Sequence, residues 1–392
     1  MRNLKIFSTV LFLLVIIFAG CEKNDISSIN GPANENDVTS LAKHGFGNFG
    51  GSNVHAVYSL TNSAAGNAVV VFKMSGHGTL TQAGTFSTGG TGSGTGLGSQ
   101  GSLVLDRGLI FACNAGSNDV SVLSVSENGL TLADKKPSGG TAPISLTVHG
   151  RLLYVLNSGT PENITGFTIN NDGTIKQIGG STQPLSGTAV GPAQIEFSPS
   201  GRVLVVTEKA ANMIDTYIVG HDGIAGAPVS QLSTGTTPYG FEFDSRGRLI
   251  VSDAYGGNAN AGAMSSYNVS AGGISLITGP VYDQQTAPCW VAVTKNGRFA
   301  YTTNTGTSNI SGYTIRHNGG LALFHDGGNT ASTGSGSSPI DMAVSSNSQY
   351  LYALSHGTNT ISVFRIGNGH GRLHAVQTIG GLESSEAGLA AN

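Results

Sequence analysis

Residues 288–304 read PCWVAVTKNGRFAYTTN, and this stretch decides the fold. It starts at a proline, alternates apolar side chains over a short strand, turns at Gly-Arg and continues as a second strand that ends in Asn. Alternation with a period of two predicts β-strands, and glycine in the turn favours a tight hairpin. The same arrangement recurs at residues 143–157 (PISLTVHGRLLYVLN) and 192–208 (PAQIEFSPSGRVLVVTE), so the hairpin belongs to a repeat.

The repeat occurs seven times between residue 54 and the C-terminus. The polar residues that end its second strand are Asn62, Asn114, Asn157, Glu208, Asp253, Asn304 and Ser355. They follow one another at intervals of roughly 43 to 52 residues, a period typical of propeller blades. The sequence therefore predicts an all-β, seven-bladed β-propeller with four-stranded antiparallel blades.

The two ends of the repeat region complement each other. Residues 54–58 already read as a second strand, so the first unit lacks an innermost strand of its own. The last six residues, 387–392, are mostly small and apolar and can supply that strand. We expect the C-terminal strand to pair into the first blade, because a closed ring leaves no open edge between its ends.

The composition agrees with many tight turns. Glycine makes up 59 of the 392 residues, while charged residues are only 10%. Hairpins use the positive φ that glycine and asparagine adopt cheaply, whereas long helices and coiled coils would need far more Glu, Lys and Arg. The net charge is −3 and no basic stripe is present, so we expect no nucleic-acid partner and no direct binding to anionic lipid.

The N-terminus reads as an export signal. Two basic residues precede an apolar run too short to span a bilayer, and this run ends at small residues before Cys21. The pattern resembles the bacterial lipoprotein signal, in which the cysteine is lipidated; the alternative is an ordinary signal peptide with an incidental cysteine. We expect a signal peptide over residues 1–20, a lipidated Cys21 and flexible tether over 21–53, and the propeller over 54–392. The expected location is a bacterial cell envelope, at the periplasmic face or the cell surface, with membrane contact through the anchor only.

The other two cysteines, Cys113 and Cys289, lie far apart inside apolar strand patterns. We expect buried thiols rather than a disulfide. No Cys/His spacing matches a zinc site, and no phosphate loop or Ser-His-Asp arrangement stands out. The sequence therefore predicts no metal, no cofactor and a monomer.

From residue 54 onward the repeats resemble the lactonase-like seven-bladed propellers, which include 6-phosphogluconolactonases and propeller-type 3-carboxymuconate cyclases. Residues 191–202 and 288–298 carry the resemblance best. It covers nearly the whole chain after the tether, and it implies the propeller fold and an acidic lactone as the substrate of enzymatic members.

The chain departs from this family at the positions that carry its chemistry. Enzymatic members typically have Gly-Pro-Arg-His where residues 191–194 read Gly-Pro-Ala-Gln. A His-containing segment is replaced by Pro-Ile-Ser at residues 143–145. Counted without gaps, the family's Asn-Glu pair falls on Glu208 and Lys209, whereas a one-residue slip would place Glu208 on the family's Glu. The family's His/Arg/Glu set therefore does not carry over.

Candidate catalytic residues remain at the centre of the ring. In each innermost strand the second and fourth positions after the proline are mixed in polarity, and we expect them near the mouth of a central channel. Glu196 and Glu242 occupy the fourth position in adjacent blades. Two neighbouring carboxylates can share a proton for acid–base work or hold a cation; alternatively, each accepts hydrogen bonds from neighbouring backbone. Glu208 is the third candidate base.

Five further residues are candidates for ligand binding. They are Ser145, Gln194, Trp290 and Asp341 at second positions, and Asp253 at the end of a second strand. Trp290, the only tryptophan, can stack on a sugar ring or belong to the core. Glu208 and Asp253 replace the Asn of other repeats, and they either hold a turn or face a pocket.

Three functions fit these observations, and fold alone does not choose among them. The leading hypothesis is an exported, lipid-anchored, lactonase-like propeller that binds a small ligand (a lactone or carbohydrate) or a protein at the channel mouth, with catalysis lost or diverged. The first alternative is an active hydrolase of a lactone or sugar-derived ester that uses the channel carboxylates. The second is a structural platform for protein interactions. Whether the chain is an enzyme stays open at this level.

Overall fold

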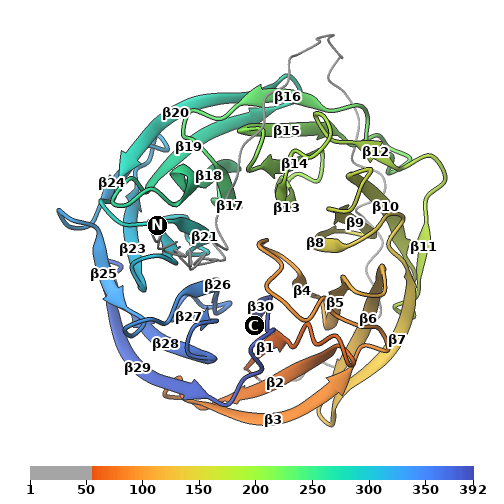
Figure 1. Ribbon diagram of the computed structural model, residues 1–392, viewed down its shortest axis with the longest axis horizontal. Helices are drawn as coiled ribbons and strands as arrows, with labels where there is room; N and C mark the ends of the chain where they lie inside the picture. The colour runs from red at the N-terminus through yellow and green to blue at the C-terminus, as the bar shows by residue number, and fades with distance from the viewer. Residues whose placement is uncertain (1–54) are drawn as a thin grey trace, which may run out of the picture.

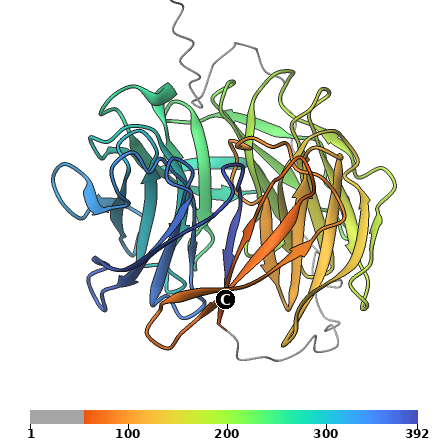
Figure 2. The same ribbon diagram turned by 60° about the horizontal axis from the view of Figure 1, so that its bottom comes forward.

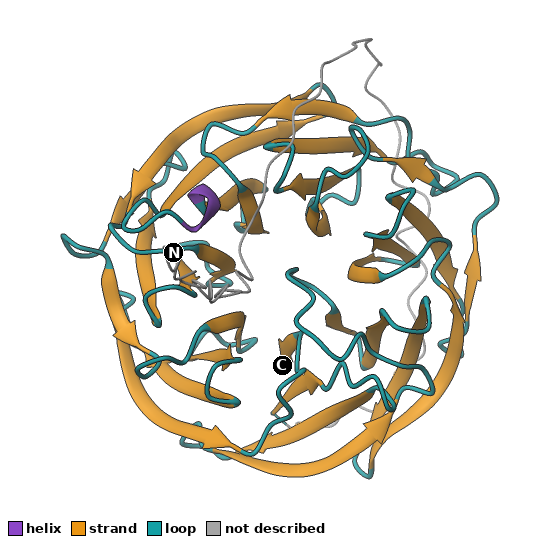
Figure 3. Cartoon of the chain, in the orientation of Figure 1, coloured by secondary structure: helices purple, strands orange, loops and turns teal. Residues whose placement is uncertain are grey.

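Thirty β-strands form seven sheets around a common axis in the computed structural model, which describes residues 55–392. Figure 1 looks down this axis and shows the sheets as the blades of a closed ring, and Figure 2 shows the ring tilted. Figure 3 shows that almost everything between the strands is loop, with one short 3₁₀ helix at Tyr255–Gly257. The predicted all-β, seven-bladed propeller is confirmed.

Each blade is a meander of antiparallel strands that runs outward from the axis. Blade 1 contains β30 (Leu389–Ala391), β1 (Ala56–Leu60), β2 (Ala68–Met74) and β3 (Leu80–Ser87). Blade 2 contains β4 (Leu103–Asp106), β5 (Leu109–Asn114), β6 (Asp119–Ser126) and β7 (Gly129–Pro137). Blade 3 contains β8 (Pro143–His149), β9 (Leu152–Asn157), β10 (Asn163–Ile169), β11 (Ile175–Gln177) and β12 (Gln183–Pro184). Blade 4 contains β13 (Pro192–Phe197), β14 (Val203–Glu208), β15 (Met213–Ile218) and β16 (Val229–Leu232).

The remaining three blades follow the same plan. Blade 5 contains β17 (Pro238–Phe243), β18 (Arg248–Asp253), β19 (Ala263–Ser270) and β20 (Gly273–Tyr282). Blade 6 contains β21 (Pro288–Val293), β22 (Phe299–Asn304), β23 (Asn309–Ile315), β24 (Leu321–Leu323) and β25 (Asn329–Ser332). Blade 7 contains β26 (Pro339–Val344), β27 (Tyr350–Ser355), β28 (Thr360–Ile366) and β29 (Leu373–Gly380).

The second strands β5, β9, β14, β18, β22 and β27 end at the residues that the repeat predicts. The exception is β1, which ends at Leu60, two residues before Asn62. The outer strands of blades 3 and 6 are each split into two short pieces, because paired glycines at residues 179–180 and 327–328 interrupt them. Cys113 and Cys289 are both buried and are not joined by a disulfide, as expected.

The C-terminal strand closes the ring. In blade 1, β30 pairs with β1, so that Leu389–Ala391 lies opposite Val57–Ser59. The Ser59 hydroxyl donates to Glu386 Oε2 at 2.8 Å, and the Ala56 N–H donates to Asn392 Oδ1 at 2.6 Å. The first and last parts of the repeat region are thus held in one sheet, which confirms the predicted closure.

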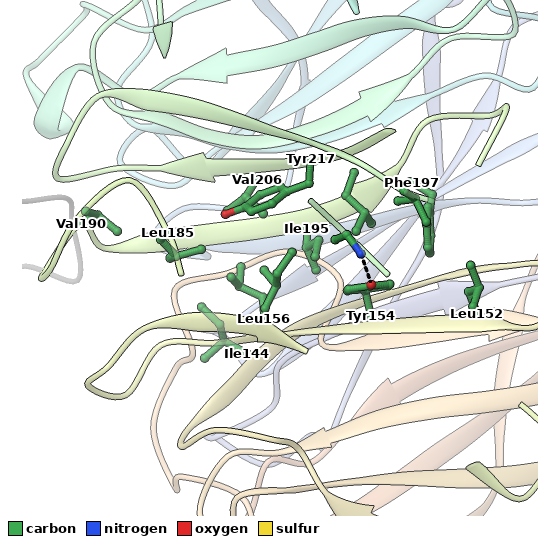
Figure 4. Close-up of a cluster of buried hydrophobic side chains, with 14 residues drawn as sticks. Ile144, Leu152, Tyr154, Leu156, Leu185, Val190, Ile195, Phe197, Val206 and Tyr217 are labelled. Carbon is green, nitrogen blue, oxygen red and sulfur yellow. Dashed lines mark hydrogen bonds between the residues drawn. The ribbon is translucent and has the colours of Figure 1, made fainter. Parts of the chain in front are cut away.

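Apolar side chains fill the space between adjacent blades. Figure 4 shows the cluster between blades 3 and 4, in which Leu156 and Tyr154 lie against Ile195 and Phe197. The Tyr154 hydroxyl is drawn accepting a hydrogen bond, from the Ala225 N–H at 2.8 Å. Because each blade buries both faces in this way, few positions meet water, which accounts for the scarcity of charge.

Three expected features of the N-terminal segment lie outside the described residues: the signal peptide, the lipidated Cys21 and the tether. Within residues 55–392, no helix has the length and apolar character needed to cross a membrane.

Candidate functional site

Polar side chains around the ring axis form hydrogen bonds with backbone groups at the open edges of the innermost strands. The strands β8, β13 and β17 are each the last strand of their sheet, so N–H groups along them have no partner within the sheet. At the boundary of blades 3 and 4, Ser145 Oγ accepts from the Ile195 N–H at 3.1 Å, and Thr147 Oγ1 accepts from the Phe197 N–H at 3.1 Å. The second and fourth positions therefore first serve to join neighbouring blades.

Gln194 does the same at the boundary of blades 4 and 5. Its Nε2 donates to the Phe241 carbonyl at 2.8 Å, and its Oε1 accepts from the Phe241 N–H at 2.8 Å. The side chain is buried, so both ends of the amide are committed to this backbone pairing. Its predicted role in ligand binding would require breaking two buried hydrogen bonds.

Glu196 and Glu242 lie one level further along the axis, and both are half-buried. Glu242 Oε2 accepts from the Val293 N–H at 2.7 Å, and its Oε1 lies 3.6 Å from Lys295 Nζ. Glu196 accepts from the Phe243 N–H and, at 3.3 Å, from the Gln194 amide. The two carboxyls are therefore neighbours that each accept a backbone hydrogen bond, and whether they share a proton or hold a cation stays a prediction.

Electrostatics distinguishes Glu196 among the residues at the axis. Burial raises the pKa of Glu196 well above its usual range, and the neighbouring Glu242 raises it further. Lys295 acts in the opposite direction, and its side chain is 56% exposed at the end of the axis where the Gly-Arg hairpins lie. A carboxyl with a raised pKa holds its proton to higher pH than usual, and in the protonated form it can donate to a bound oxygen atom or act as a general acid.

The other end of the axis, where the innermost strands begin with proline, is filled by the long loop of residues 88–102. Gln100 from this loop donates from Nε2 to the Val291 carbonyl at 2.7 Å and accepts from the Val291 N–H at 2.9 Å. Gln100 thus pairs with the backbone of β21 in the way that Gln194 pairs with the backbone of β17. The residue of β17 that would otherwise make this contact is Gly240, which has no side chain. A Cβ at Gly240 would lie 2.2 Å from Gln100 Oε1, so only glycine leaves room for the loop.

An apolar cluster completes this filled end. Trp290 is 5% exposed, lies 5.0 Å from the Tyr239 ring, and donates from its indole N–H to the Ser99 carbonyl at 2.9 Å. Ala193 packs in the same cluster. Lys209 Nζ lies 4.7 Å from the centre of the Tyr239 ring and donates to a loop carbonyl. Trp290 therefore belongs to the core at this end, and stacking on a sugar would require the loop to move.

Glu208 lies inside blade 4 rather than on the axis. It is fully buried, accepts from the Ser186 N–H at 2.9 Å and from the Ser186 hydroxyl, and shares a hydrogen bond with Asp215. Burial, together with the Asp215 carboxyl, raises the pKa of Glu208 to about 9. Burial raises the pKa of Asp215 too, so the pair as a whole holds a proton to higher pH than exposed carboxyls do.

The Asn residues at the same point of blades 2, 3 and 6 have the same task. Asn114 Nδ2 donates to Asp119 Oδ1 at 2.5 Å and to Ser121 Oγ at 2.8 Å, which ties the second strand to the third. Glu208 and Asp215 make the corresponding contact in blade 4. The geometry accordingly matches the turn-holding alternative for Glu208.

Asp253 and Asp341 are also buried within the protein. Asp253 accepts from the Ser265 hydroxyl at 2.6 Å, and burial raises its pKa to about 7. Asp341 accepts from the Leu389 N–H at 3.0 Å, and burial raises its pKa to about 8. Asp341 thereby holds the closing strand β30 against blade 7.

The structure brings together only part of the predicted site. Glu196, Glu242 and Gln194 are neighbours at the axis, whereas Glu208 and Asp253 lie apart from them within blades 4 and 5. That any of the three glutamates acts as a base stays a prediction. Within residues 55–392 no three His, Cys, Asp or Glu side chains are grouped so that they could hold a metal ion.

Sequence reasoning missed Gln100 and Lys295. Lys295 had a usable signal, because it lies two residues after the end of the innermost strand of blade 6. For Gln100 the sequence contained only an indirect signal: Gly240 has no side chain to pair with the next blade, so another residue must do so. The loop that holds Gln100 is rich in Gly, Ser and Thr and shows no periodicity.

Comparison with known proteins places this geometry in context. The sequence model of the family described as "Lactonase, 7-bladed beta-propeller" matches residues 63–183 and 274–384. A 6-phosphogluconolactonase of Serratia proteamaculans is 26% identical over 145 residues, which cover 36% of this chain and 42% of the relative. A 6-phosphogluconolactonase of Yersinia pestis is 22% identical over 166 residues, 41% of this chain and 48% of the relative. The chain thus spans less than half the length of these curated relatives.

Solved structures share the fold over nearly their whole length. The periplasmic gluconolactonase of Pseudomonas aeruginosa superimposes with a TM-score of 0.66 at 14% identity, covering 86% of this chain and 99% of that one. A protein from Lactobacillus plantarum reaches a TM-score of 0.69 at 13% identity, with 86% and 99% coverage. At such identities the likeness establishes the fold alone.

Proposed function

Because the chain belongs to the lactonase family of seven-bladed β-propellers, we propose that it is an exported, lipid-anchored member that binds a small ligand or a partner protein and no longer hydrolyses lactones. The proposed location is the cell envelope of a bacterium, reached through the N-terminal signal and Cys21. A structural neighbour is itself described as a periplasmic gluconolactonase, so export is compatible with this fold.

The observation that carries the loss of hydrolysis is the use made of residues 193 and 194. Enzymes that this chain resembles have Arg and His there, whereas Ala193 is packed among Tyr239 and Trp290, and Gln194 is paired with backbone. The loop of residues 88–102 fills the adjoining space through Ser99 and Gln100. A substrate at this end would meet Ala193 and Gln194 instead of the Arg and His of the enzymes that this chain resembles.

The ligand site that we propose is the opposite end of the axis, around Glu196, Glu242 and Lys295. This end combines a carboxyl with a raised pKa, a second carboxyl and an accessible ammonium group. Such a set can donate to and accept from the hydroxyl and carbonyl oxygens of a lactone or carbohydrate. The negative charge of Glu242 and the positive charge of Lys295 lie close together, which favours a ligand without a large net charge.

The test is thermal melting of the full-length protein with lactones, neutral sugars and divalent cations in turn. A ligand that binds the folded state raises the melting temperature. We expect one of the first two classes to do so, and we expect Glu196→Gln with Glu242→Gln to abolish the shift. If no compound shifts the melt, the small-ligand site is wrong and the chain is a platform for protein partners.

One observation favours the rival function, an active hydrolase. The raised pKa of Glu196 beside Glu242 is the kind of tuning that acid–base catalysis uses. If the protein hydrolyses a lactone or sugar ester, this pair is the candidate acid and base. The double Gln variant then loses the activity, and Glu208→Gln keeps it because that side chain lies within blade 4.

A further inference from the structure

A tyrosine hydroxyl joins neighbouring blades at several boundaries of the ring. Tyr154 of blade 3 donates to the Gly223 carbonyl of blade 4 at 2.8 Å, and Tyr301 of blade 6 donates to the Gly371 carbonyl of blade 7 at 2.7 Å. Tyr352 of blade 7 reaches a methionine sulfur of blade 1 at 2.6 Å. In each case a second-strand tyrosine contacts residues at or beside the outer hairpin of the next blade.

Tyr58 occupies the same place in blade 1. It lies opposite Ala390 of the innermost strand, as Tyr154 lies opposite Thr147. Its ring is 2% exposed and packs against Leu123 and other residues of blade 2. Unlike the other three, its hydroxyl has no hydrogen-bond partner anywhere in residues 55–392.

The cause is the length of the facing hairpin. In blade 4 the hairpin loops out over residues 220–224 and reaches Tyr154. In blade 2 the turn has only two residues between Ser126 and Gly129, which pair with each other. The outer hairpin of blade 5 has an equally short turn, and this hairpin faces blade 4. There the position of the tyrosine is occupied by Val205, whose side chain forms no hydrogen bonds.

The short turn leaves a cavity of about 70 Å³ between blades 1 and 2. Its lining consists of Ala56, Tyr58, Val71, Lys73, Ala83, Phe86 and residues 125–130. Phe86 forms a partly buried aromatic wall and packs so closely on Gly129 that a side chain there would overlap it. Lys73 and Glu127 are exposed and place one positive and one negative charge in the lining.

We propose that this cavity binds the edge of a neutral sugar or polyol, whose hydroxyl group takes the place of the missing hairpin as the partner of Tyr58. Burial raises the pKa of Tyr58, so the phenol stays protonated and able to donate. One charge of each sign in the lining favours a ligand without net charge, and both side chains can hydrogen-bond hydroxyl groups. Apolar walls and the Phe86 ring suit the C–H face of a sugar ring.

The size of the cavity sets how much of the ligand enters. One water needs about 10–15 Å³ of this kind of space, so the cavity takes several water-sized groups, enough for one edge of a sugar ring. The rest of the ring would lie outside, near Lys73 and Glu127. This site is separate from Glu196 and Glu242 at the axis, and it does not depend on the function proposed there.

The test is saturation-transfer NMR on the full-length protein with D-glucose and myo-inositol as probes, and with glucuronate and glucosamine as charged controls. We expect millimolar binding of the neutral probes and weaker binding of both charged ones. Tyr58→Phe should weaken binding about tenfold while leaving the melting temperature unchanged, since no protein hydrogen bond is lost. Ala83→Phe should block the cavity from its exposed wall.

Tyr154→Phe is the matched control. It removes two protein hydrogen bonds, so it should lower the melting temperature by several degrees and leave probe binding intact. Any of three results overturns the proposal: no saturation transfer to either neutral probe, Tyr58→Phe binding as tightly as the parent, or Tyr58→Phe melting as early as Tyr154→Phe. Variants of Glu196 and Glu242 should not alter this binding, which separates it from the axis site.

Discussion

At the level of single residues, the polar side chains around the axis have two tasks that a sequence does not separate. Ser145 and Gln194 are polar because the next blade presents unpaired backbone groups to them. Glu196 does this too, but it retains partial exposure and an altered pKa. A polar side chain at the ring axis therefore indicates a binding site only where some of its donors or acceptors are not used by the backbone of the next blade.

Gly240 gives a direct test of how the filled end is built. In Gly240→Ala the new Cβ would lie 2.2 Å from Gln100 Oε1 and 2.5 Å from the Cys289 carbonyl oxygen, so loop or strand must shift. We expect a loss of about 2 kcal/mol of unfolding free energy, typical of overpacking. Chemical denaturation measures it.

Gly96→Ala is the control for that measurement, because nothing lies within 4 Å of its Cβ position in the same loop. Equal stabilities of the two variants would show that the loop does not occupy the space beside Gly240.

The limits of sequence reasoning are also visible at single positions. Strand ends at Asn114 and Asp253 were predictable because a repeat shows the same local pattern several times over. The contact of Gln100 with Val291 was not, since it joins positions 191 residues apart through a loop without periodicity. For the same reason, the exposure of Glu196 and the burial of Trp290 could be stated only as alternatives.

Among the elements, the closing strand β30 matters most for stability. It is three residues long, yet it supplies the innermost strand of blade 1, and its Leu389 N–H donates a hydrogen bond to Asp341. Residues Glu386 and Asn392 on either side add hydrogen bonds to Ser59 and Ala56. The ring is thus held shut by a small set of buried contacts.

Deletion of residues 387–392 tests this closure. Removing them exposes the inner edge of β1 and leaves the buried Asp341 without the Leu389 N–H, so we expect the melting temperature to fall by 10 °C or more, an order-of-magnitude figure for losing several kcal/mol in a large domain. Differential scanning calorimetry measures it. An unchanged melt would show that β30 does not hold the ring.

For the whole molecule, the buried carboxyls set a pH dependence of stability. Burial raises the pKa of Glu208 to about 9, of Asp341 to about 8, and of Asp253 and Glu386 to about 7. A raised folded-state pKa favours folding below the unfolded pKa, near 4, and this contribution is lost as the pH rises through the folded value. We therefore expect the melting temperature to fall steadily between pH 5 and pH 9.

The matched variant for this trend is Glu208→Gln, which mimics the protonated side chain at every pH. It should reduce the decline between pH 7 and pH 9 while melting close to the parent at pH 5. A protein that becomes more stable from pH 5 to pH 9 would contradict the assigned burial of these carboxyls.

The central claim concerns the molecule as a whole: it is a propeller of the lactonase family, and we propose that it no longer hydrolyses lactones at its proline end. The most direct measurement is hydrolysis of 6-phosphogluconolactone and gluconolactone by the full-length protein, followed by proton release. The spontaneous rate is subtracted, and an active 6-phosphogluconolactonase serves as positive control. The account predicts a rate equal to that of the protein-free blank for both lactones. Turnover that saturates with substrate and disappears in the Glu196→Gln, Glu242→Gln variant would contradict it.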